Sequence, residues 1–349
     1  MNLHALREPI VQAPLAGGAS TPRLAAAVSD AGGFGFLAAG YKSAATVAEN
    51  IRELRSLSGE AFGVNIFAPP AAAIDDLALE AYAASLRDEA DRYGVELGEP
   101  VSDDDDFTAK VELVARERVA VVSFTFGCPP PSVFARLHDA GCDVWVTVTN
   151  PDEALSAEAA GADALVVQGF EAGGHRAYFV DTVDPFDLGL LAALRLIARR
   201  VRLPLVATGG IVDGASVAAV LCAGAAAAQV GSALMLTPEA GTSPTHRRAL
   251  ESAAGATRLT RAFSGRQARG IVNRFLEDHS AQAPIAYPQV HHLTTPVRAA
   301  ARAADDPQAV NLWAGQTYTL VEGAPAGDVV RRLAAEARQA SQDLARRLG

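Results

Sequence analysis

The sequence predicts an α/β protein in which eight strand–helix units close into a (β/α)8, or TIM, barrel. Eight short apolar runs recur along the chain, at Ile10–Ala13, Phe34–Ala38, Phe62–Phe67, Val119–Phe124, Val144–Thr149, Ala164–Gln168, Pro204–Thr208 and Ala226–Val230. Most are continuously apolar instead of alternating, which is typical of strands buried on both faces. Helical patterns lie between them, and eight such repeats indicate a closed parallel sheet.

Capping residues mark where several of the helices should begin. Thr21 precedes Pro22 and an apolar segment that ends in glycine, and Ser43 and Asp213 precede two further amphipathic segments. Such side chains accept hydrogen bonds from first-turn N–H groups, and proline suits the first helical position. Pro151 opens another helix with acidic residues in its first turn. The amphipathic segment Ala326–Leu348 should form a last helix outside the barrel.

Two intervals are too long for simple strand–helix connections. The first carries a helical pattern at Ile74–Tyr93 and an acidic run at Asp103–Asp106, interpreted as a solvated loop or helix start and not as a metal site. The second, Thr237–Ala304, has no strand pattern. We therefore expect a barrel formed by residues 1–68, 105–237 and 312–349. A smaller helical subdomain, residues 69–104 and 238–311, should cover the active-site mouth.

Composition narrows the class of protein. Half of the 349 residues are hydrophobic and the net charge is −10, which argues against nucleic acid and anionic membranes as partners. The chain has no uncharged apolar run of about 18 residues and begins without the apolar segment of a secretory signal. Cys128, Cys142 and Cys222 lack metal-ligand spacing and are expected as buried, reduced thiols in a cytoplasmic protein without a metal.

The segment Gln168–Arg176, QGFEAGGHR, is the most informative stretch of the chain. It follows a predicted buried strand and precedes a predicted helix at Asp187–Arg199. Glycine permits close backbone approach, and histidine changes charge near neutral pH. The segment therefore predicts a loop that holds His175 over a ligand.

Glycines also follow the last two predicted strands, at Gly209-Gly210 and at Gly231-Ser232. Taken singly, these glycines could simply make tight turns. In a TIM barrel, however, phosphate often binds in the loops after strands seven and eight through backbone N–H groups. The pair therefore favours a phosphate site, to which Ser232 could add a hydroxyl, and hence a nucleotide-type cofactor.

These motifs resemble those of the nitronate monooxygenases, a family of FMN-dependent TIM barrels once called 2-nitropropane dioxygenases. The resemblance covers almost the whole chain. It is carried by Pro9–Gly18, Asn65–Phe67, Val122–Gly127, Gln168–Arg176, Ala207–Gly214, Gln229–Ser232, Thr260–Gly270 and Leu312–Gln316. The sequence departs from the family at Leu15, where methionine is commoner, and at Ala177, where many members have glycine.

The resemblance implies a cofactor site and a catalytic residue. FMN would contact Ala13, Pro14, Leu15, Asn65, Gln168, Gly173, Gly209, Gly210, Gln229, Gly231 and Ser232. Within this set, Gln168 would reach the flavin, Gly173 would let backbone approach it, and Gly210 with Gln229–Ser232 would hold the phosphate. His175 matches the catalytic histidine, and a pKa near its ordinary value would suit a base at neutral pH.

The implied reaction is the oxidation of alkyl nitronates or nitroalkanes by O2 to a carbonyl compound and nitrite, with His175 removing the α-proton of neutral nitroalkanes. Some neighbouring residues have open roles: Glu171 could orient the imidazole, Ser264 could close over the site, and His291-His292 could form a pocket wall. A carboxylate-bearing substrate would favour an arginine at the mouth. The candidates are Arg176, Arg261, Arg266 and Arg269.

Three other functions are compatible with parts of the pattern. An FMN-dependent NAD(P)H oxidoreductase, reducing a quinone or an enoyl thioester, would share the same flavin loops. An inosinate-type dehydrogenase would need a cysteine nucleophile in the loop after strand six, and that loop has none. A non-catalytic FMN sensor would keep the barrel without turnover. The oligomeric state is open, and a homo-oligomer is compatible with the sequence.

Overall fold

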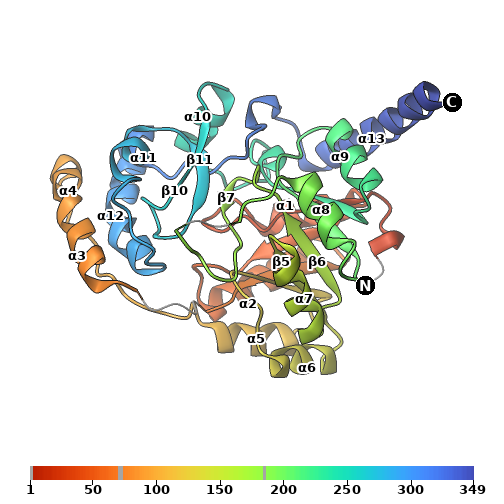
Figure 1. Ribbon diagram of the computed structural model, residues 1–349, viewed down its shortest axis with the longest axis horizontal. Coiled ribbons are helices and arrows are strands. Elements are labelled where there is room, and N and C mark those ends of the chain that lie inside the picture. Colours follow the sequence, from red (N-terminus) through yellow and green to blue (C-terminus); the bar gives the residue numbers. More distant parts are fainter. Residues whose placement is uncertain (1–2, 70–73, 184–185) are drawn as a thin grey trace.

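The computed structural model describes residues 3–69, 74–183 and 186–349, and in these residues eight parallel strands form a TIM barrel (Figure 1). They are β1 (Ile10–Gln12), β2 (Gly35–Ala38), β3 (Phe62–Phe67), β4 (Val121–Thr125), β5 (Asp143–Val148), β6 (Ala164–Gln168), β8 (Leu205–Thr208) and β9 (Ala227–Val230). Their order is β1-β9-β8-β6-β5-β4-β3-β2. A parallel bridge between Val11 and Phe34 joins the two ends of the sheet. The predicted fold and all eight predicted strands are confirmed.

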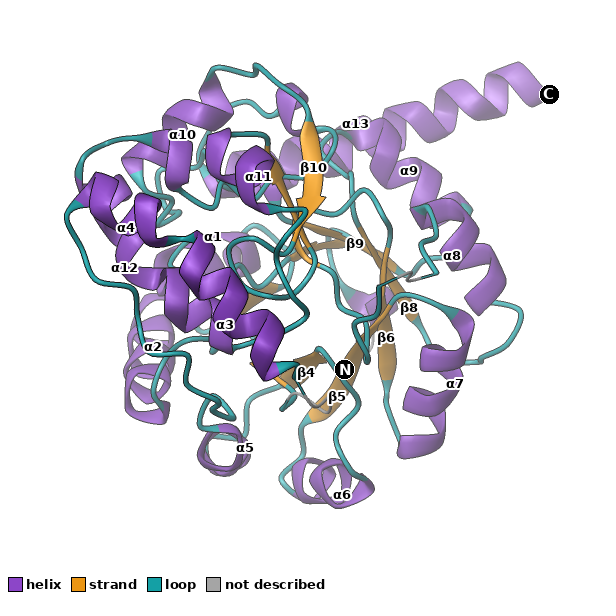
Figure 2. Ribbon diagram, turned by 60° about the vertical axis from the view of Figure 1, so that its left-hand side comes forward, coloured by secondary structure: helices purple, strands orange, loops and turns teal. Residues whose placement is uncertain are grey.

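Helices surround this barrel in the predicted places. They are α1 (Pro22–Asp30), α2 (Ala44–Leu57), α5 (Phe107–Arg116), α6 (Pro131–Asp139), α7 (Pro151–Ala160), α8 (Leu190–Ile197), α9 (Gly214–Cys222) and α13 (Ala326–Leu348). Thr21, Ser43 and Asp213 cap their helices as predicted. Helix α8 is shorter than the predicted Asp187–Arg199 at both ends, with Gly189 and Ala198 at its caps. The buried part of α13 ends at Ala337, and the rest projects away from the body (Figures 1 and 2).

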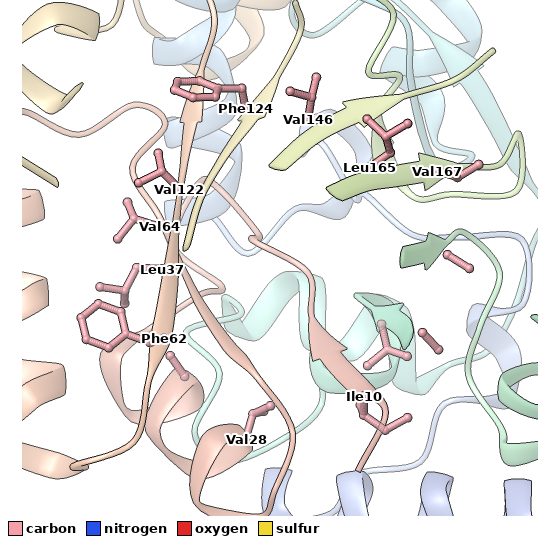
Figure 3. Close-up of a cluster of buried hydrophobic side chains, with 14 of the residues drawn as sticks. Ile10, Val28, Leu37, Phe62, Val64, Val122, Phe124, Val146, Leu165 and Val167 are labelled. Atoms are coloured by element: carbon pink, nitrogen blue, oxygen red, sulfur yellow. The ribbon is translucent and has the colours of Figure 1, made fainter. Parts of the chain in front are cut away.

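The barrel has a core on each side of its strands. Inside it, Trp145 packs against Phe34 and Phe36, with ring centroids 5.9 and 5.6 Å away. Outside it, alternate strand residues such as Val64 and Val146 pack against the surrounding helices (Figure 3). The strands are therefore buried on both faces, which explains why their sequences are continuously apolar.

A second hydrophobic cluster lies beside the barrel and draws on both insertions and on segments next to them. Its helices are α3 (Asp76–Ser85), α4 (Arg87–Tyr93), α10 (Pro244–Glu251), α11 (Arg274–His279) and α12 (Gln289–Ala303). Short 3-10 helices also occur, at Leu3–Ala5, Ser232–Leu234, Pro307–Ala309 and Tyr318–Leu320. Residues 70–73 of the predicted first insertion lie outside the described residues, and the predicted domain boundaries stay a prediction.

The prediction that residues 237–304 contain no strand is wrong. This interval holds β10 (Thr257–Thr260) and β11 (Ala268–Ile271), which form an antiparallel sheet with β7 (Gly174–His175). The two strands have only four residues each and carry polar side chains, so neither has a continuous apolar run. Their pairing with each other and with a distant loop stabilises them, and a local pattern does not report such pairing.

Two smaller expectations can also be compared with the structure. Cys142 is buried and Cys128 is half-buried, but Cys222 is exposed, so the prediction of three buried thiols is wrong. The buried residues of α9 are Gly214, Val217 and Val220, and Cys222 lies off that face. The acidic run forms a loop and helix start as expected: Asp106 is the residue before α5, and Asp105 pairs with the buried Lys110. Among the described residues, no group of three or more His, Cys, Asp or Glu side chains suits a metal ion, and no helix could cross a membrane.

Candidate active site

A cavity of about 420 Å³ opens at the carboxyl ends of the barrel strands and extends beneath the second cluster. Its size is in the range of about 300–1,000 Å³ that is usual for small-molecule and cofactor pockets. All twelve residues predicted from the sequence line it: Ala13, Pro14, Leu15, Asn65, Gln168, Gly173, His175, Gly209, Gly210, Gln229, Gly231 and Ser232. The structure therefore brings the predicted set together, while the role of each residue stays a prediction.

One end of the cavity, here called the glycine end, consists of Gly209, Gly210, Gly231, Ser232 and Gly315. Gly209 and Gly210 have φ values of +124° and +68°, which side-chain-bearing residues rarely adopt. The hydroxyl of Ser232 accepts a hydrogen bond from Gly315 N at 3.0 Å, so its own proton is available to a ligand. This end can therefore offer backbone and hydroxyl donors to an anion.

Gly173 has a structural reason to be glycine besides the predicted one. A Cβ at this position would lie 2.5 Å from Ala314 C and 2.5 Å from Gly315 N. The missing side chain therefore makes room for the backbone that crosses the loop between β6 and β7. Gly315 and Thr317, which line the cavity next to this crossing, were not among the predicted residues.

Two buried amides occupy the strand ends. Asn65 Nδ2 donates to Ser123 Oγ and Thr125 Oγ1, both at 2.9 Å, and to Ser123 O at 3.2 Å. In the described part of the chain nothing donates to Asn65 Oδ1, which leaves an acceptor for a ligand. Gln168 instead organises its own loop: its Oε1 accepts from Arg176 Nη1 and Ala177 N, and its Nε2 donates to His175 O at 3.0 Å.

The other end of the cavity, here called the imidazole end, is centred on His175. Strand pairing between β7 and β11 places His175 opposite Ala268. Its Nε2 lies 2.8 Å from Ser264 Oγ. The rings of Phe126, Tyr287 and Trp313 surround the imidazole at centroid distances of 5.6, 5.9 and 5.5 Å.

The charge state of His175 differs from the expectation. Burial, together with the positive charges of Arg266 and Arg298, lowers the pKa of His175 to about 3. The predicted pKa near the ordinary value is therefore wrong, and the imidazole is neutral at neutral pH. Ser264 was considered only as a residue that could close over the site, and the structure places it in direct contact with the imidazole.

None of the four candidate arginines lines the cavity. Arg176 is fully buried and donates to Gly169 O, and Arg269 donates to Phe170 O. Arg261 pairs with Asp181, and Arg266 stacks over the Phe126 ring, 4.2 Å from its centroid. Each of the four thus binds the loop that carries His175 or the rings around it.

Two other arginines, Arg298 and Arg302, line the cavity instead. They lie on α12 with His291 and Thr295, at positions that share one helix face. His291 therefore belongs to the pocket wall, as considered from the sequence, and its ring stacks on Tyr41 at 4.1 Å. The spacing of these four residues was available in the sequence, but nothing in it indicated that this face of α12 covers the barrel.

Glu171 does not orient the imidazole. Its two carboxylate oxygens accept hydrogen bonds from Leu190 N, at the start of α8, at 3.1 and 3.0 Å. It is therefore a helix-capping residue. Other cavity residues that sequence reasoning missed are Tyr41, Phe126, Thr242, His246 and Trp313.

Comparison with known proteins places this architecture in a family. The nitronate monooxygenase family profile matches residues 2–336. The chain belongs to the nitronate monooxygenase family. Family membership makes it an oxidoreductase of a flavin-using family with a TIM-barrel fold. The resemblance inferred from the sequence is thereby confirmed.

Relatives align over nearly the full chain. A nitronate monooxygenase of Paraburkholderia phytofirmans is 40% identical over 97% of this chain and 94% of its own length. One of Pseudomonas aeruginosa is 40% identical over 95% of this chain and 97% of its own. Among solved structures, nitroalkane oxidase from Streptomyces ansochromogenes has a TM-score of 0.94 at 50% identity, covering 97% of this chain and 98% of that chain. FabK from Thermotoga maritima has a TM-score of 0.76 at 25% identity, covering 98% and 96%.

Proposed function

We propose that the cavity binds FMN and that the protein oxidises alkyl nitronates and nitroalkanes with O2 to a carbonyl compound and nitrite. The observation that carries this proposal is that one cavity joins the glycine end to His175. Relatives named for nitronate or nitroalkane oxidation support the same substrates.

The residues present suit FMN. The glycine end offers backbone N–H groups at positive-φ glycines and the Ser232 hydroxyl to a phosphate. Asn65 offers an unused acceptor, and the segment Ala13–Leu15 lines the same cavity. When bound there, the flavin would accept the electrons that a nitronate loses; the protein supplies placement and exclusion of water.

We infer that His175 removes the α-proton of a neutral nitroalkane through Nδ1. Ser264 Oγ has a single proton, and it donates to Arg266 O at 3.1 Å. With that proton on Arg266 O, Nε2 of His175 carries a proton and donates to Ser264, which puts the lone pair on Nδ1. The α-C–H bond breaks, its proton moves to Nδ1, and the electron pair delocalises into the nitro group.

The low pKa of His175 affects this step in two ways. The imidazole is always unprotonated and ready to accept a proton at neutral pH, but the imidazolium that forms is disfavoured by burial and by Arg266 and Arg298. A nitronate anion formed beside it offsets these effects, because an opposite charge at short range stabilises the protonated base. The imidazolium of His175 and the nitronate anion thus stabilise each other.

One experiment tests the proposal against its main alternative. Purified protein is denatured, and the released cofactor is identified by chromatography and absorbance. The intact protein is then assayed for nitronate-dependent O2 uptake with nitrite formation, and separately for NADH or NADPH consumption with a quinone or an enoyl thioester. We expect FMN and nitrite. Rapid NAD(P)H consumption without nitronate turnover would establish the reductase, and a bound flavin without any turnover would indicate a sensor.

A further inference from the structure

The cavity carries positive groups without compensating carboxylates. Arg298 and Arg302 line it, whereas none of the described lining residues is Asp or Glu. The whole chain has a net charge of −10, so the cavity is opposite in sign to the protein as a whole. A concave surface lined by one sign of charge attracts ligands of the other sign.

Of the two arginines that line the cavity, Arg298 is the buried one. Its residue surface is 6% exposed, and in the described part of the chain no Asp or Glu oxygen lies within 4.0 Å of its guanidinium. Buried arginines are normally paired with an anion. Burial lowers the pKa of Arg298 to about 10, so the side chain is still charged at neutral pH.

The hydrogen bonds of Arg298 hold the guanidinium in place and leave part of it free. Nε donates to Thr294 Oγ1 at 3.0 Å, and Nη2 donates to His291 O and Thr295 Oγ1, both at 2.7 Å. Within the described residues Nη1 has no acceptor, and it is not among the buried polar atoms that protein seals from solvent. Two N–H donors of a positioned arginine are therefore available to a ligand in the cavity.

The guanidinium of Arg298 lies next to His291, and its charge reaches His175. The charge of Arg298 acts on His175, His291 and Tyr41, lowering the pKa of both histidines. Nη2 also lies 3.4 Å from His291 Nδ1, and the His291 ring stacks on Tyr41. Arg266, the other buried cation near His175, does not line the cavity and donates to the carbonyls of Arg176 and Tyr178.

We propose that Arg298 binds the planar NO2 group of the nitronate through Nη1, opposite His175. This assignment rests on the proposed function and names the residue that recognises the substrate's charge. A nitronate carries full negative charge on its two oxygens, whereas a neutral nitroalkane carries little. Arg298 therefore favours the anion that forms as His175 takes the α-proton, and its effect is strengthened by the surrounding aromatic rings, which exclude water.

The test compares three variants of the FMN-loaded protein. Arg298→Gln removes the charge, and Arg298→Lys keeps it but loses the planar fork. Arg331→Gln, the control, removes an exposed charge on α13 that does not line the cavity. We expect kcat/KM for ethyl nitronate to fall about 10- to 100-fold in R298Q, as for a lost charge-assisted hydrogen bond. R298K should show a smaller loss, and R331Q a change below about threefold.

A binding measurement separates this assignment from the proposed function. Nitrate and propionate have planar anionic groups of the nitronate's shape and are not oxidised, so their binding is followed by calorimetry and by flavin absorbance. We expect both to bind the wild-type protein and R331Q, and to bind R298Q at least about tenfold more weakly. The same loss in a protein that does not oxidise nitronates would leave the Arg298 assignment standing and would refute the function.

A purely structural role for Arg298 predicts different results. R298Q would then lower thermal stability and FMN content and would reduce turnover of neutral and anionic substrates alike, with R298K no better. Equal anion binding in the wild-type protein and in a folded, flavin-loaded R298Q or R298K would overturn the proposal. So would a loss confined to nitronates that carry a separate carboxylate, because Arg298 would then bind that carboxylate.

Discussion

The two ends of the cavity are built in different ways. The glycine end is made mainly of backbone: Gly209, Gly210 and Gly231 follow adjacent barrel strands, and Ser232 adds one hydroxyl. The imidazole end is made of side chains from distant segments, since His175 contacts Ser264 across 89 residues and Trp313 across a still longer interval. The first end belongs to the barrel, and the second exists only because the second cluster lies over it.

Because they are built differently, the two ends of the cavity suit different ligands. Backbone donors at strand ends are rigid and suit a cofactor that stays bound. Each side chain contributes its own charge and its own proton affinity. Side chains therefore suit a substrate whose charge changes during the reaction. Mutations at the two ends should therefore give separable defects, in flavin retention at one and in substrate turnover at the other.

The largest separable effect is expected from His175→Ala. Removing the base should lower kcat/KM for neutral nitroalkanes about 10²- to 10⁴-fold, the usual contribution of a general base. Preformed nitronates have already lost the proton and should be affected far less. Steady-state rates on both substrate forms, at matched FMN content, measure the ratio. Equal losses on the two forms would remove the base assignment.

At the glycine end, Gly210→Val should weaken FMN binding about 10- to 100-fold, because a β-branched residue at φ +68° is strained and its Cβ would lie 3.0 Å from Glu171 Cβ. Gly231→Ala is the matched control. Gly231 lacks positive φ, and a Cβ there would lie 3.4 Å from Leu15 Cδ2, near ordinary contact distance. Fluorescence titration with FMN compares the two. Similar affinities would show that the backbone geometry at Gly210 does not matter for the cofactor.

Ser232→Ala should have a smaller effect on the same property. Loss of one hydroxyl donor, worth about 0.5–1.5 kcal/mol, predicts FMN binding about 2- to 10-fold weaker. Circular dichroism should be unchanged, and Ser232→Thr should bind FMN like the wild type because it keeps the hydroxyl. If S232A retained FMN fully, the phosphate would have to lie elsewhere.

The smallest effect concerns pH at the imidazole end. With its pKa lowered from 6.5 to about 3, His175 stays neutral between about pH 5 and 8, so kcat/KM for neutral nitroalkanes should not fall through a pKa near 6.5. The folded state also binds fewer protons at this site than the unfolded state. The contribution of His175 to the free energy of unfolding is therefore present above pH 6.5 and is lost as pH falls toward 3. A pH–rate profile that bends near 6.5 and disappears in H175A would contradict the lowered pKa.

Sequence reasoning succeeded where the determinant was local. Continuous apolar runs identified every barrel strand, and capping residues such as Thr21 and Ser43 marked helix starts correctly. The predicted site residues converged on one cavity because each lies at a strand end or in the loop that follows, and parallel strands bring those ends together. It failed where partners were distant, as with β10 and β11, whose pairing has no local apolar signal.

By itself, the sequence determined the barrel, the glycine end and the place of His175 in the cavity. Hydrophobic periodicity and strand-end position depend on neighbours along the chain, so both can be recognised in the sequence. Only the tertiary structure decided which arginines line the cavity and what charge His175 carries. Arg266 and Arg298 lower the pKa of that imidazole from segments about 90 and 120 residues away, and burial has the larger effect. Desolvation and charge proximity are properties of packing, so they become visible only when distant segments are brought together.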